Sequence, residues 1–218
     1  MGHQISVIIP HMERREEFLR TAVLPSIVKN LPNEIIVVAN PSLNAQEKRN
    51  AGARAASQPF LFFCDDDVVL RERALEHFIN AILINKSFGF TYSDWSVTVR
   101  PGVSYPYSPG VRKPDGDITK RLRYESPICT MSLIRKEAFP GFDEQLRRHQ
   151  DRDLFLTILE NGWGCRYVPG VQVEMHQIDD SISTTEDYER WERYVELKHG
   201  LPFRRPEMPS PGNLPSRR

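Results

Sequence analysis

The sequence lacks long apolar runs and has no excess of either charge. None of its 218 residues lies in a hydrophobic stretch near the roughly 18 residues that a membrane-spanning helix needs. No signal peptide is recognisable at the amino terminus, so we expect a cytoplasmic protein. The formal net charge is zero, which removes any global attraction to nucleic acid or to an anionic membrane.

Cysteine is scarce as well. Cys64, Cys129 and Cys165 are odd in number, far apart in the chain and without the spacing of a metal site. This pattern predicts reduced, mostly buried thiols rather than a disulfide framework. The length allows one large domain or two small ones, either of which can bury a sizeable core.

Short apolar runs alternate with amphipathic stretches in the first ninety residues. Three runs are almost continuously apolar, which is typical of strands buried on both faces: Ile5–Ile9, Glu34–Val38 and Phe60–Cys64. Helical spacing of apolar residues follows each run, at 11–31, 46–57 and 75–83, and Pro25 should kink or split the first helix. Right-handed crossovers then predict an α/β fold, with a mostly parallel sheet flanked by helices.

The second half of the chain has a different composition and a less regular order of elements. Its expected elements are strands at 88–99 and 128–134, a helix at 150–160, short strands at 167–168 and 171–175, and a helix at 188–198. A long segment rich in proline and glycine separates the first two strands, and loops of this length are usually functional or mobile.

Three adjacent carboxylates end the third apolar run. Asp65, Asp66 and Asp67 repel one another and cannot enter a core unpaired. Ligands of open parallel sheets bind outside the carboxyl ends of the strands, and Pro10-His11 and Ala39-Asn40 lie at two further such ends. A divalent cation with oxygen ligands is one interpretation of the cluster. The other is a solvated acidic turn that caps the following helix.

Four segments occur in a recognisable order. They are SVIIP near the start, EIIVV followed by Asn40 and Ser42, KRNAGARAA running into FFCDDDV, and RKEAFPGFDE followed by QDRDL and His176. In this order the chain resembles an inverting, family-2-type glycosyltransferase with the GT-A fold, from about Ile5 to Ser183. The resemblance implies a hexosyltransferase-type reaction and leaves the sugar open.

The resemblance implies a donor site at the acidic cluster. Asp65 and Asp67 match a DxD motif that contacts metal and ribose, and Asp66 between them could share either role. His176 matches a late histidine that completes the metal or diphosphate site, and a surface histidine is the alternative. The implied cofactor is Mn²⁺ or Mg²⁺, which stabilises the charge that grows on a diphosphate leaving group.

Further residues match the nucleotide contacts of the family. Pro10, His11 and Glu13 line the first strand end, where relatives hold the base. Arg49 lies in a segment that reads ARNxG in relatives and matches a phosphate or base contact, with a solvated helix charge as the alternative. Asn40 stands where many relatives carry an aspartate that reads uracil. A UDP-sugar is therefore the favoured donor, and the departure at Asn40 leaves the base open.

The second half is expected to supply the general base and the acceptor contacts. An inverting transfer needs a carboxylate within hydrogen-bond reach of the acceptor hydroxyl. Asp151 matches that position, although Gln150 replaces the usual preceding glutamate; a structural acid at a helix amino terminus is the alternative. Asp153 in the same turn is expected to be structural. The candidate acceptor contacts are Asp94, Trp95, Tyr105 and Tyr107.

These matches divide the chain into a Rossmann-like, nucleotide-sugar-binding half at 1–99, an acceptor-binding and catalytic half at 100–200, and a proline-rich basic tail at 201–218. A retaining transferase on the same fold and a non-catalytic nucleotide- or carbohydrate-binding module stay open. A nucleotidyltransferase is disfavoured because PHMERRE lacks the glycine of a phosphate loop. The expected acceptor is a carbohydrate hydroxyl, with lipid-linked sugar, protein and modified nucleic acid also open.

Overall fold

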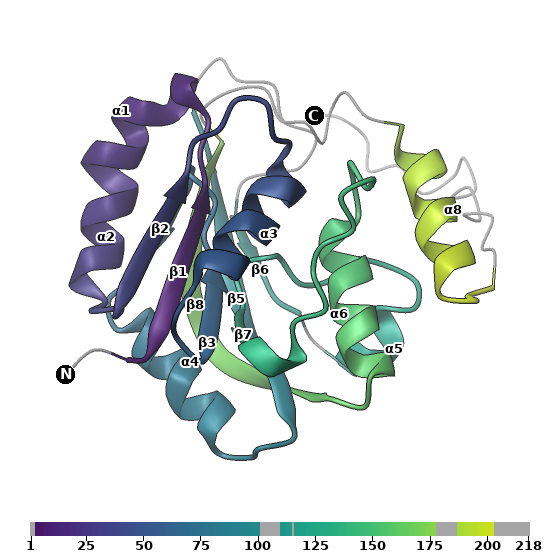
Figure 1. Cartoon of the computed structure of the whole chain (residues 1–218). Helices are drawn as coiled ribbons and strands as arrows, with labels where there is room; N and C mark the ends of the chain where they lie inside the picture. The colour runs from purple at the N-terminus through teal and green to yellow at the C-terminus, as the bar shows by residue number, and fades with distance from the viewer. Residues whose placement is uncertain (1–2, 101–109, 115, 178–186, 203–218) are drawn as a thin grey trace, which may run out of the picture.

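The computed structural model describes residues 3–100, 110–114, 116–177 and 187–202. A mixed sheet lies at its centre, with the strand order β2-β1-β3-β7-β5-β8-β4 and with β6 paired to β5 (Figure 1). The strands are β1 (Ile5–Pro10), β2 (Glu34–Val38), β3 (Phe60–Phe63), β4 (Val68–Leu70), β5 (Phe88–Val99), β6 (Gly110–Arg112), β7 (Leu133–Arg135) and β8 (Gly164–Gln177).

The direction of the strands agrees with the expected mostly parallel sheet. β1 pairs in parallel with β2 on one side and with β3 on the other. β7 enters antiparallel between β3 and β5, and β8 then runs parallel to β5. β2, β1, β3, β5 and β8 therefore end at the same edge of the sheet, which is where the acidic cluster follows β3.

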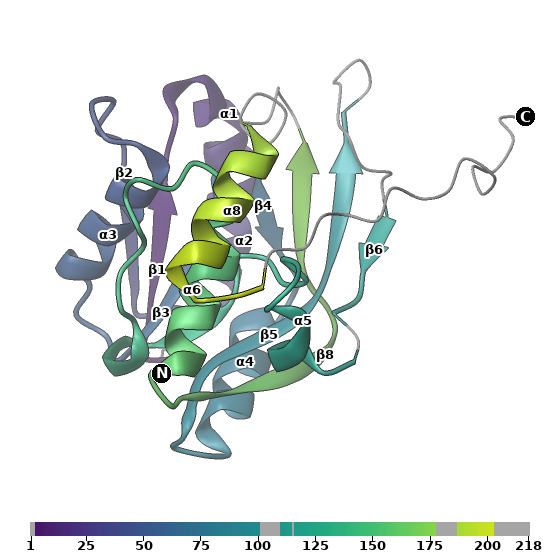
Figure 2. The same ribbon diagram turned by 90° about the vertical axis from the view of Figure 1, so that its right-hand side faces the viewer.

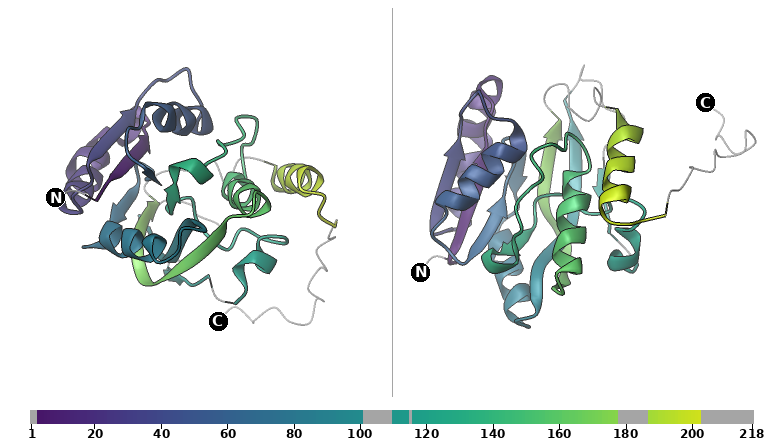
Figure 3. Two further views of the ribbon diagram at one scale, coloured as in Figure 1. Left: turned by 60° about the horizontal axis from the view of Figure 1, so that its bottom comes forward. Right: turned by 45° about the vertical axis from the view of Figure 1, so that its right-hand side comes forward.

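Helices cover both faces of the sheet (Figures 2 and 3). They are α1 (Glu16–Phe18), α2 (Leu24–Lys29), α3 (Ala45–Ala55), α4 (Ala74–Leu83), α5 (Ile118–Arg121), α6 (Gln150–Glu160) and α8 (Tyr188–Lys198). The alternation of side chains along β1 separates two cores. Val7 and Ile9 pack with α2 and α4, whereas Ile8 packs with α3, α6 and α8.

Pro25 coincides with a change of helix type rather than with a break, because residues 16–29 are helical without interruption. A π-helical turn, Leu19–Val23, joins α1 to α2, and Pro25 lies at the amino-terminal end of α2. The π turn changes the hydrogen-bond register just before Pro25, which has no N–H group to donate. The cysteine prediction is confirmed, since all three are free thiols and both Cys64 and Cys129 are buried.

The second half contains two wrong strand predictions. The two short strands expected at 167–168 and 171–175 form one long strand, β8, which absorbs the interruption through shifts of register against Ser93–Trp95 of β5. The strand expected at 128–134 is only β7, because residues 128–132 are buried without pairing along the sheet. β4, with three residues, is too short for periodicity to reveal.

α3 lies very close to β1. A Cβ atom on Gly52 would come within 2.3 Å of Cγ2 of the fully buried Ile8, so the glycine of the KRNAG segment permits this approach. The close packing fixes the helix next to the strand end and thereby positions Lys48 and Arg49 one turn earlier. No helix in the described ranges is both long and apolar enough to cross a membrane.

Candidate active site

Asp66 is the most buried member of the acidic cluster. Its carboxylate accepts hydrogen bonds from the Met12 N–H at 2.7 Å and from Arg15 Nη1 at 2.9 Å, and lies 3.1 Å from Nδ1 of His11. Its side chain is only 1% exposed. The middle aspartate therefore ties the turn after β3 to the segment after β1, and two of the three expected strand ends meet.

Asp65 is more open than Asp66, whereas Asp67 is buried as well. Arg49 donates to Asp65, whose side chain is 24% exposed, and Arg15 pairs with Asp67 at 2.8 Å. The backbone N–H of His176 donates to the Asp67 carbonyl at 2.8 Å, so the end of β8 meets the acidic turn. The two outer aspartates thus flank the turn while Asp66 anchors it.

The His176 ring lies beside this turn without joining a ready-made ligand set. It packs against Phe18 with ring centroids 5.2 Å apart, and its Nε2 lies 3.4 Å from Glu174. Within the described ranges, no three His, Cys, Asp or Glu side chains are grouped to hold a metal ion. Hard cations often use only one or two carboxylates and take their other ligands from phosphate and water. Asp65 and Asp67, as oxygen donors at one turn, fit that kind of site.

Arg49 is a buried cation with donors to spare. Its residue is 4% exposed, its guanidinium lies 5.4 Å from the Phe142 ring centroid, and its Nε and Nη1 have no hydrogen-bond partner among the described residues. A buried guanidinium with unsatisfied donors is costly. An anionic ligand beside Asp65 would accept hydrogen bonds from these donors. An arginine on a solvated helix would need no such ligand, because water would satisfy its donors.

Asp151 lies in the first turn of α6, and its charge and that of Asp65 both act on the buried Cys129. Burial raises the pKa of its carboxyl group above the usual range, while the Arg152 N–H, the Ser126 hydroxyl and the Arg49 charge oppose the rise. Burial also raises the pKa of Cys129 to about 12, and the charges of both Asp151 and Asp65 add to that rise. Arg49 and Cys129 therefore both lie within electrostatic range of the acidic turn and of Asp151.

The first turn of α6 is held firmly. The buried Arg152 donates from Nε to the Leu122 carbonyl at 2.8 Å and from Nη2 to the Arg123 carbonyl at 2.7 Å. Asp153 accepts from His199 at 2.9 Å and from Lys198. Asp153 thus joins α6 to the end of α8, in agreement with the structural role expected for it.

The other predicted nucleotide contacts differ in their burial and in their hydrogen bonds. Pro10 is buried at the end of β1, and the next N–H, of His11, donates to the Val38 carbonyl at 3.0 Å. Glu13 and Asn40 are exposed, and the Asn40 side chain accepts from the Ser42 N–H at 2.9 Å. The Asn40 side chain is thus engaged by its own turn rather than directed to the acidic cluster.

The predicted acceptor contacts are placed only in part. Asp94 is buried and accepts from the Tyr167 hydroxyl at 2.7 Å. Trp95 packs partly buried against the core shared by α2 and α4, and its indole N–H has no partner among the described residues. Tyr105 and Tyr107 lie outside the described residues.

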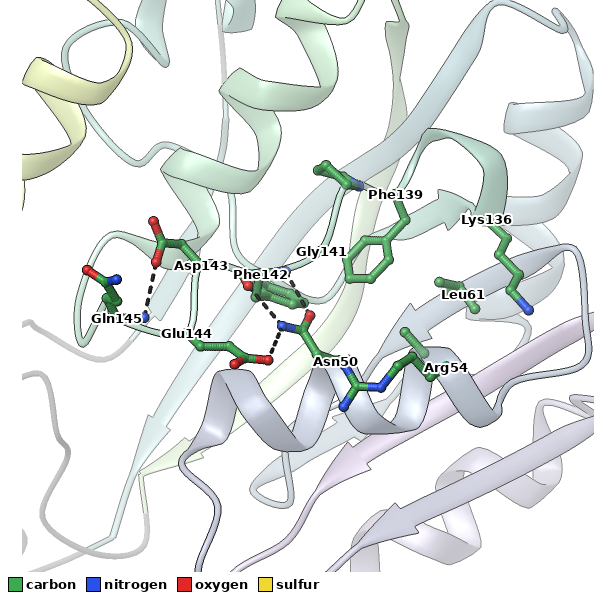
Figure 4. Close-up of a pocket in the computed structure, with 12 residues that line it drawn as sticks. Asn50, Arg54, Leu61, Lys136, Phe139, Gly141, Phe142, Asp143, Glu144 and Gln145 are labelled. Atoms are coloured by element: carbon green, nitrogen blue, oxygen red, sulfur yellow. Dashed lines mark hydrogen bonds between the residues drawn. The ribbon is translucent and has the colours of Figure 1, made fainter.

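A cavity of about 730 Å³ lies between α3 and the segment after β7 (Figure 4). Asn50 closes one side of it, because its side chain bonds to the backbone N–H and carbonyl of Phe142 and to Glu144. The acidic cluster is not among the residues that line this cavity. Asn50 therefore serves to fix the Phe142 ring beneath Arg49 rather than to face the aspartates.

Sequence reasoning missed two buried cations of the site. Arg15 bridges Asp66 and Asp67, and Lys48 donates from Nζ to the His11 carbonyl at 2.7 Å. Arg15 lies in a run of five charged residues, which is typical of a solvated helix. Lys48 stands where relatives carry alanine, and that departure was the available signal.

Residues 21–141, more than half of the chain, match the family model described as glycosyl transferase family 2. The chain belongs to this family. Its mixed sheet flanked by helices is accordingly a GT-A fold, as the resemblance implied.

A curated relative supports the same family. An uncharacterized glycosyltransferase of Haemophilus influenzae is 26% identical over 186 residues, covering 72% of this chain and 62% of that protein. The chain therefore spans less than two thirds of the length of this relative.

Solved structures of S. aureus TarS share the fold. The complex of TarS residues 1–349 with UDP-GlcNAc has a TM-score of 0.62 and 13% identity, covering 91% of this chain and 66% of that one. The corresponding complex with UDP has a TM-score of 0.61 and 16% identity, with coverages of 91% and 65%.

Proposed function

We propose that this family 2 member is a metal-dependent glycosyltransferase that moves a sugar from a nucleotide-diphosphate donor to an acceptor hydroxyl with inversion. The observation that carries the proposal is Arg49, a buried guanidinium with two unpartnered donors, paired with Asp65 and acting electrostatically on Asp151. A polyanionic donor beside Asp65 would satisfy those donors. UDP is the favoured nucleotide, since the related fold of TarS has been solved with UDP and with UDP-GlcNAc.

The acidic turn would hold the donor. Asp65 and Asp67 are the residues that would bind Mn²⁺ or Mg²⁺, with His176 at the edge of the site. When bound, such a cation stabilises negative charge on the diphosphate leaving group. Asp66 keeps the turn in place through Arg15 and Met12. Asp65, Arg49 and the residues after β1 would contact the nucleotide.

Asp151 would act as the general base. It takes the proton of the acceptor hydroxyl as the new bond from that oxygen to the anomeric carbon forms. The bond from the same carbon to the diphosphate breaks with its electron pair on the leaving group, so the sugar inverts. The raised pKa of Asp151 makes its carboxylate a stronger base than an ordinary aspartate.

A thermal-shift panel of nucleotides and nucleotide-sugars, with and without Mn²⁺, tests the donor side. We expect UDP or a UDP-sugar to raise the melting temperature more with Mn²⁺ than without it. The Asp65→Asn variant should lose this increment. Asp117→Asn is a matched control, because Asp117 caps α5 and forms an exposed pair with Lys120, and asparagine caps a helix equally well. Failure of every nucleotide diphosphate to bind would contradict the donor assignment.

Product analysis separates the proposed reaction from its alternatives. Donor hydrolysis or transfer, followed by NMR of the product anomer, distinguishes inversion from retention. A non-catalytic binding module would bind UDP and release no sugar from any UDP-sugar over many hours. That result would contradict the proposed transferase activity but would agree with nucleotide binding.

A further inference from the structure

The charges of α8 lie on two different sides of the helix. Glu192 and Glu196 act on the buried Arg152 of α6, with a distance of 3.8 Å between Glu192 Oε1 and Arg152 Nη1. Arg190 and Arg193, one turn apart and both exposed, occupy another side. Glu192 and Glu196 are therefore directed to the protein, whereas Arg190 and Arg193 lie at its surface together with Glu189.

A groove of about 740 Å³ opens on the basic side of α8, against the segment that leads into α6. Three arginines line it, Arg147, Arg190 and Arg193, together with Trp191 and Tyr194. No acidic side chain of the described residues is among its lining. With a formal net charge of zero over the whole chain, this concentration of guanidinium groups is local.

The groove is partly preorganised. The Arg190 guanidinium lies 4.8 Å from the centroid of the mostly buried Trp191 ring, which restricts it. The Tyr194 hydroxyl donates to Asp143 at 3.1 Å, and Lys198 pairs with that acid at 2.9 Å and with Asp153 as well. The negative charge beside the groove is therefore partly offset by Lys198.

The groove adjoins the segment that carries the proposed base. Arg147 precedes Asp151 by four residues, and Tyr188 at the start of α8 contacts His149 with ring centroids 4.6 Å apart. Figure 2 shows α8 alongside α6, on the face of the sheet opposite α2 and α4. A chain lying in the groove would pass beside the amino-terminal end of α6.

We propose that this groove binds an anionic carbohydrate chain, the acceptor of the transfer, through its phosphate or carboxylate groups. Guanidinium groups bind both anions with paired hydrogen bonds, and aromatic side chains provide a surface for sugar rings. The inference rests on the proposed function and names the substrate class of its acceptor side. It assigns Arg147, Arg190 and Arg193 to substrate binding.

Direct binding to defined polymers tests the assignment. Dextran phosphate, polygalacturonate and neutral dextran of similar length are titrated into the full chain by calorimetry at low and moderate salt. We expect a charged polymer to bind and neutral dextran not to bind, with affinity falling as salt rises. The phosphate and carboxylate arms identify which anion the groove prefers.

Variants locate the binding. The double variant Arg190→Gln/Arg193→Gln should weaken binding of the preferred polymer about tenfold or more, as expected for the loss of two charge-assisted contacts. Arg166→Gln is the matched control, because Arg166 is an exposed arginine on β8 outside the groove. UDP binding and the melting temperature of both variants should equal those of the unmodified chain.

The outcomes separate this inference from the proposed function. Unchanged polymer affinity in the double variant, with UDP still bound, would overturn the groove assignment alone. Equal loss in the Arg166 variant would attribute the binding to general charge and overturn it as well. Tighter binding of duplex DNA than of either polymer, lost in the double variant, would overturn the carbohydrate assignment. Absence of UDP binding would instead count against the donor site.

Discussion

Asp66 differs from the aspartates on either side of it, because its carboxylate is already engaged by Arg15, His11 and the Met12 N–H. Asp65 remains partly exposed next to Arg49. The sequence presents three identical side chains and cannot distinguish them. Their difference arises from which oxygen atoms the segment after β1 reaches in the folded chain.

This difference predicts separate effects of two similar substitutions. Asp66→Asn should lower the free energy of unfolding by about 3–5 kcal/mol, because it removes the more buried of the two carboxylates that pair with the buried Arg15. Asp65→Asn should reduce donor binding and should destabilise the protein less than Asp66→Asn, because the Asp65 side chain is 24% exposed and an asparagine oxygen can still accept from Arg49. Urea denaturation and nucleotide titration measure the two effects. A stability loss of the same size in both variants would contradict the division of roles.

Asp151 gives a prediction for the dependence of transfer on pH. Its raised pKa keeps the carboxyl protonated to a higher pH than an ordinary aspartate, so the rate should rise with pH until the group ionises. Gln150→Glu adds a neighbouring negative charge and should move this rise to still higher pH. Asp151→Asn should reduce kcat about 100-fold or more and leave UDP binding unchanged. Near-normal transfer by Asp151→Asn would show that another group is the base.

At the scale of whole elements, the contact between α6 and α8 depends on ionised groups. The His199 side chain lies between Asp153 at 2.9 Å and Glu160 at 2.7 Å, and Lys198 pairs with both Asp143 and Asp153. Hydrogen bonds and charges from Asp153 and Glu160 raise the pKa of His199 above its usual value, although burial acts against them. The protonated imidazolium therefore holds α8 to α6.

The direction of this shift sets the pH dependence of stability. Because the pKa of His199 is raised on folding, its stabilising contribution is complete below the unfolded pKa and disappears as pH rises through the folded pKa. The melting temperature should thus fall from mildly acidic to mildly alkaline pH. His199→Gln should flatten that fall and lower stability by about 1–3 kcal/mol at the acidic end. An unchanged slope in the variant would assign the pH dependence to other groups.

The helices and strands that could be predicted were those with a clear periodicity of apolar residues. β1, β2, β3, β5, α4 and α8 carry clear periodicity, and their existence could be predicted within a few residues. β8 was divided in prediction because Pro169-Gly170 breaks its pattern, whereas pairing with β5 continues through register shifts. The proline and glycine predicted that the strand would end there. The hydrogen bonds with β5 on both sides of this point keep the strand continuous.

For the whole molecule, the two expected halves share one sheet. β7 and β8 from the second half lie among β3, β5 and β4 from the first. The order of the motifs predicted the family, because each motif keeps its place along the chain. The acceptor contacts were harder to predict, since exposed aromatic residues serve many purposes; Asp94 is bonded to Tyr167, and Trp95 packs on the core.

The position of β8 also has a consequence for how the protein is made. Val69 of β4 and Glu174 of β8 pair directly, so β4 must wait for more than one hundred further residues to leave the ribosome. Until then, β5 lacks its longest neighbour and exposes an edge that can pair with other chains. A chain truncated after Trp163 should therefore fail to unfold cooperatively in denaturant and should aggregate at micromolar concentration. Nascent copies of this protein are expected to depend on chaperones until β8 has left the ribosome.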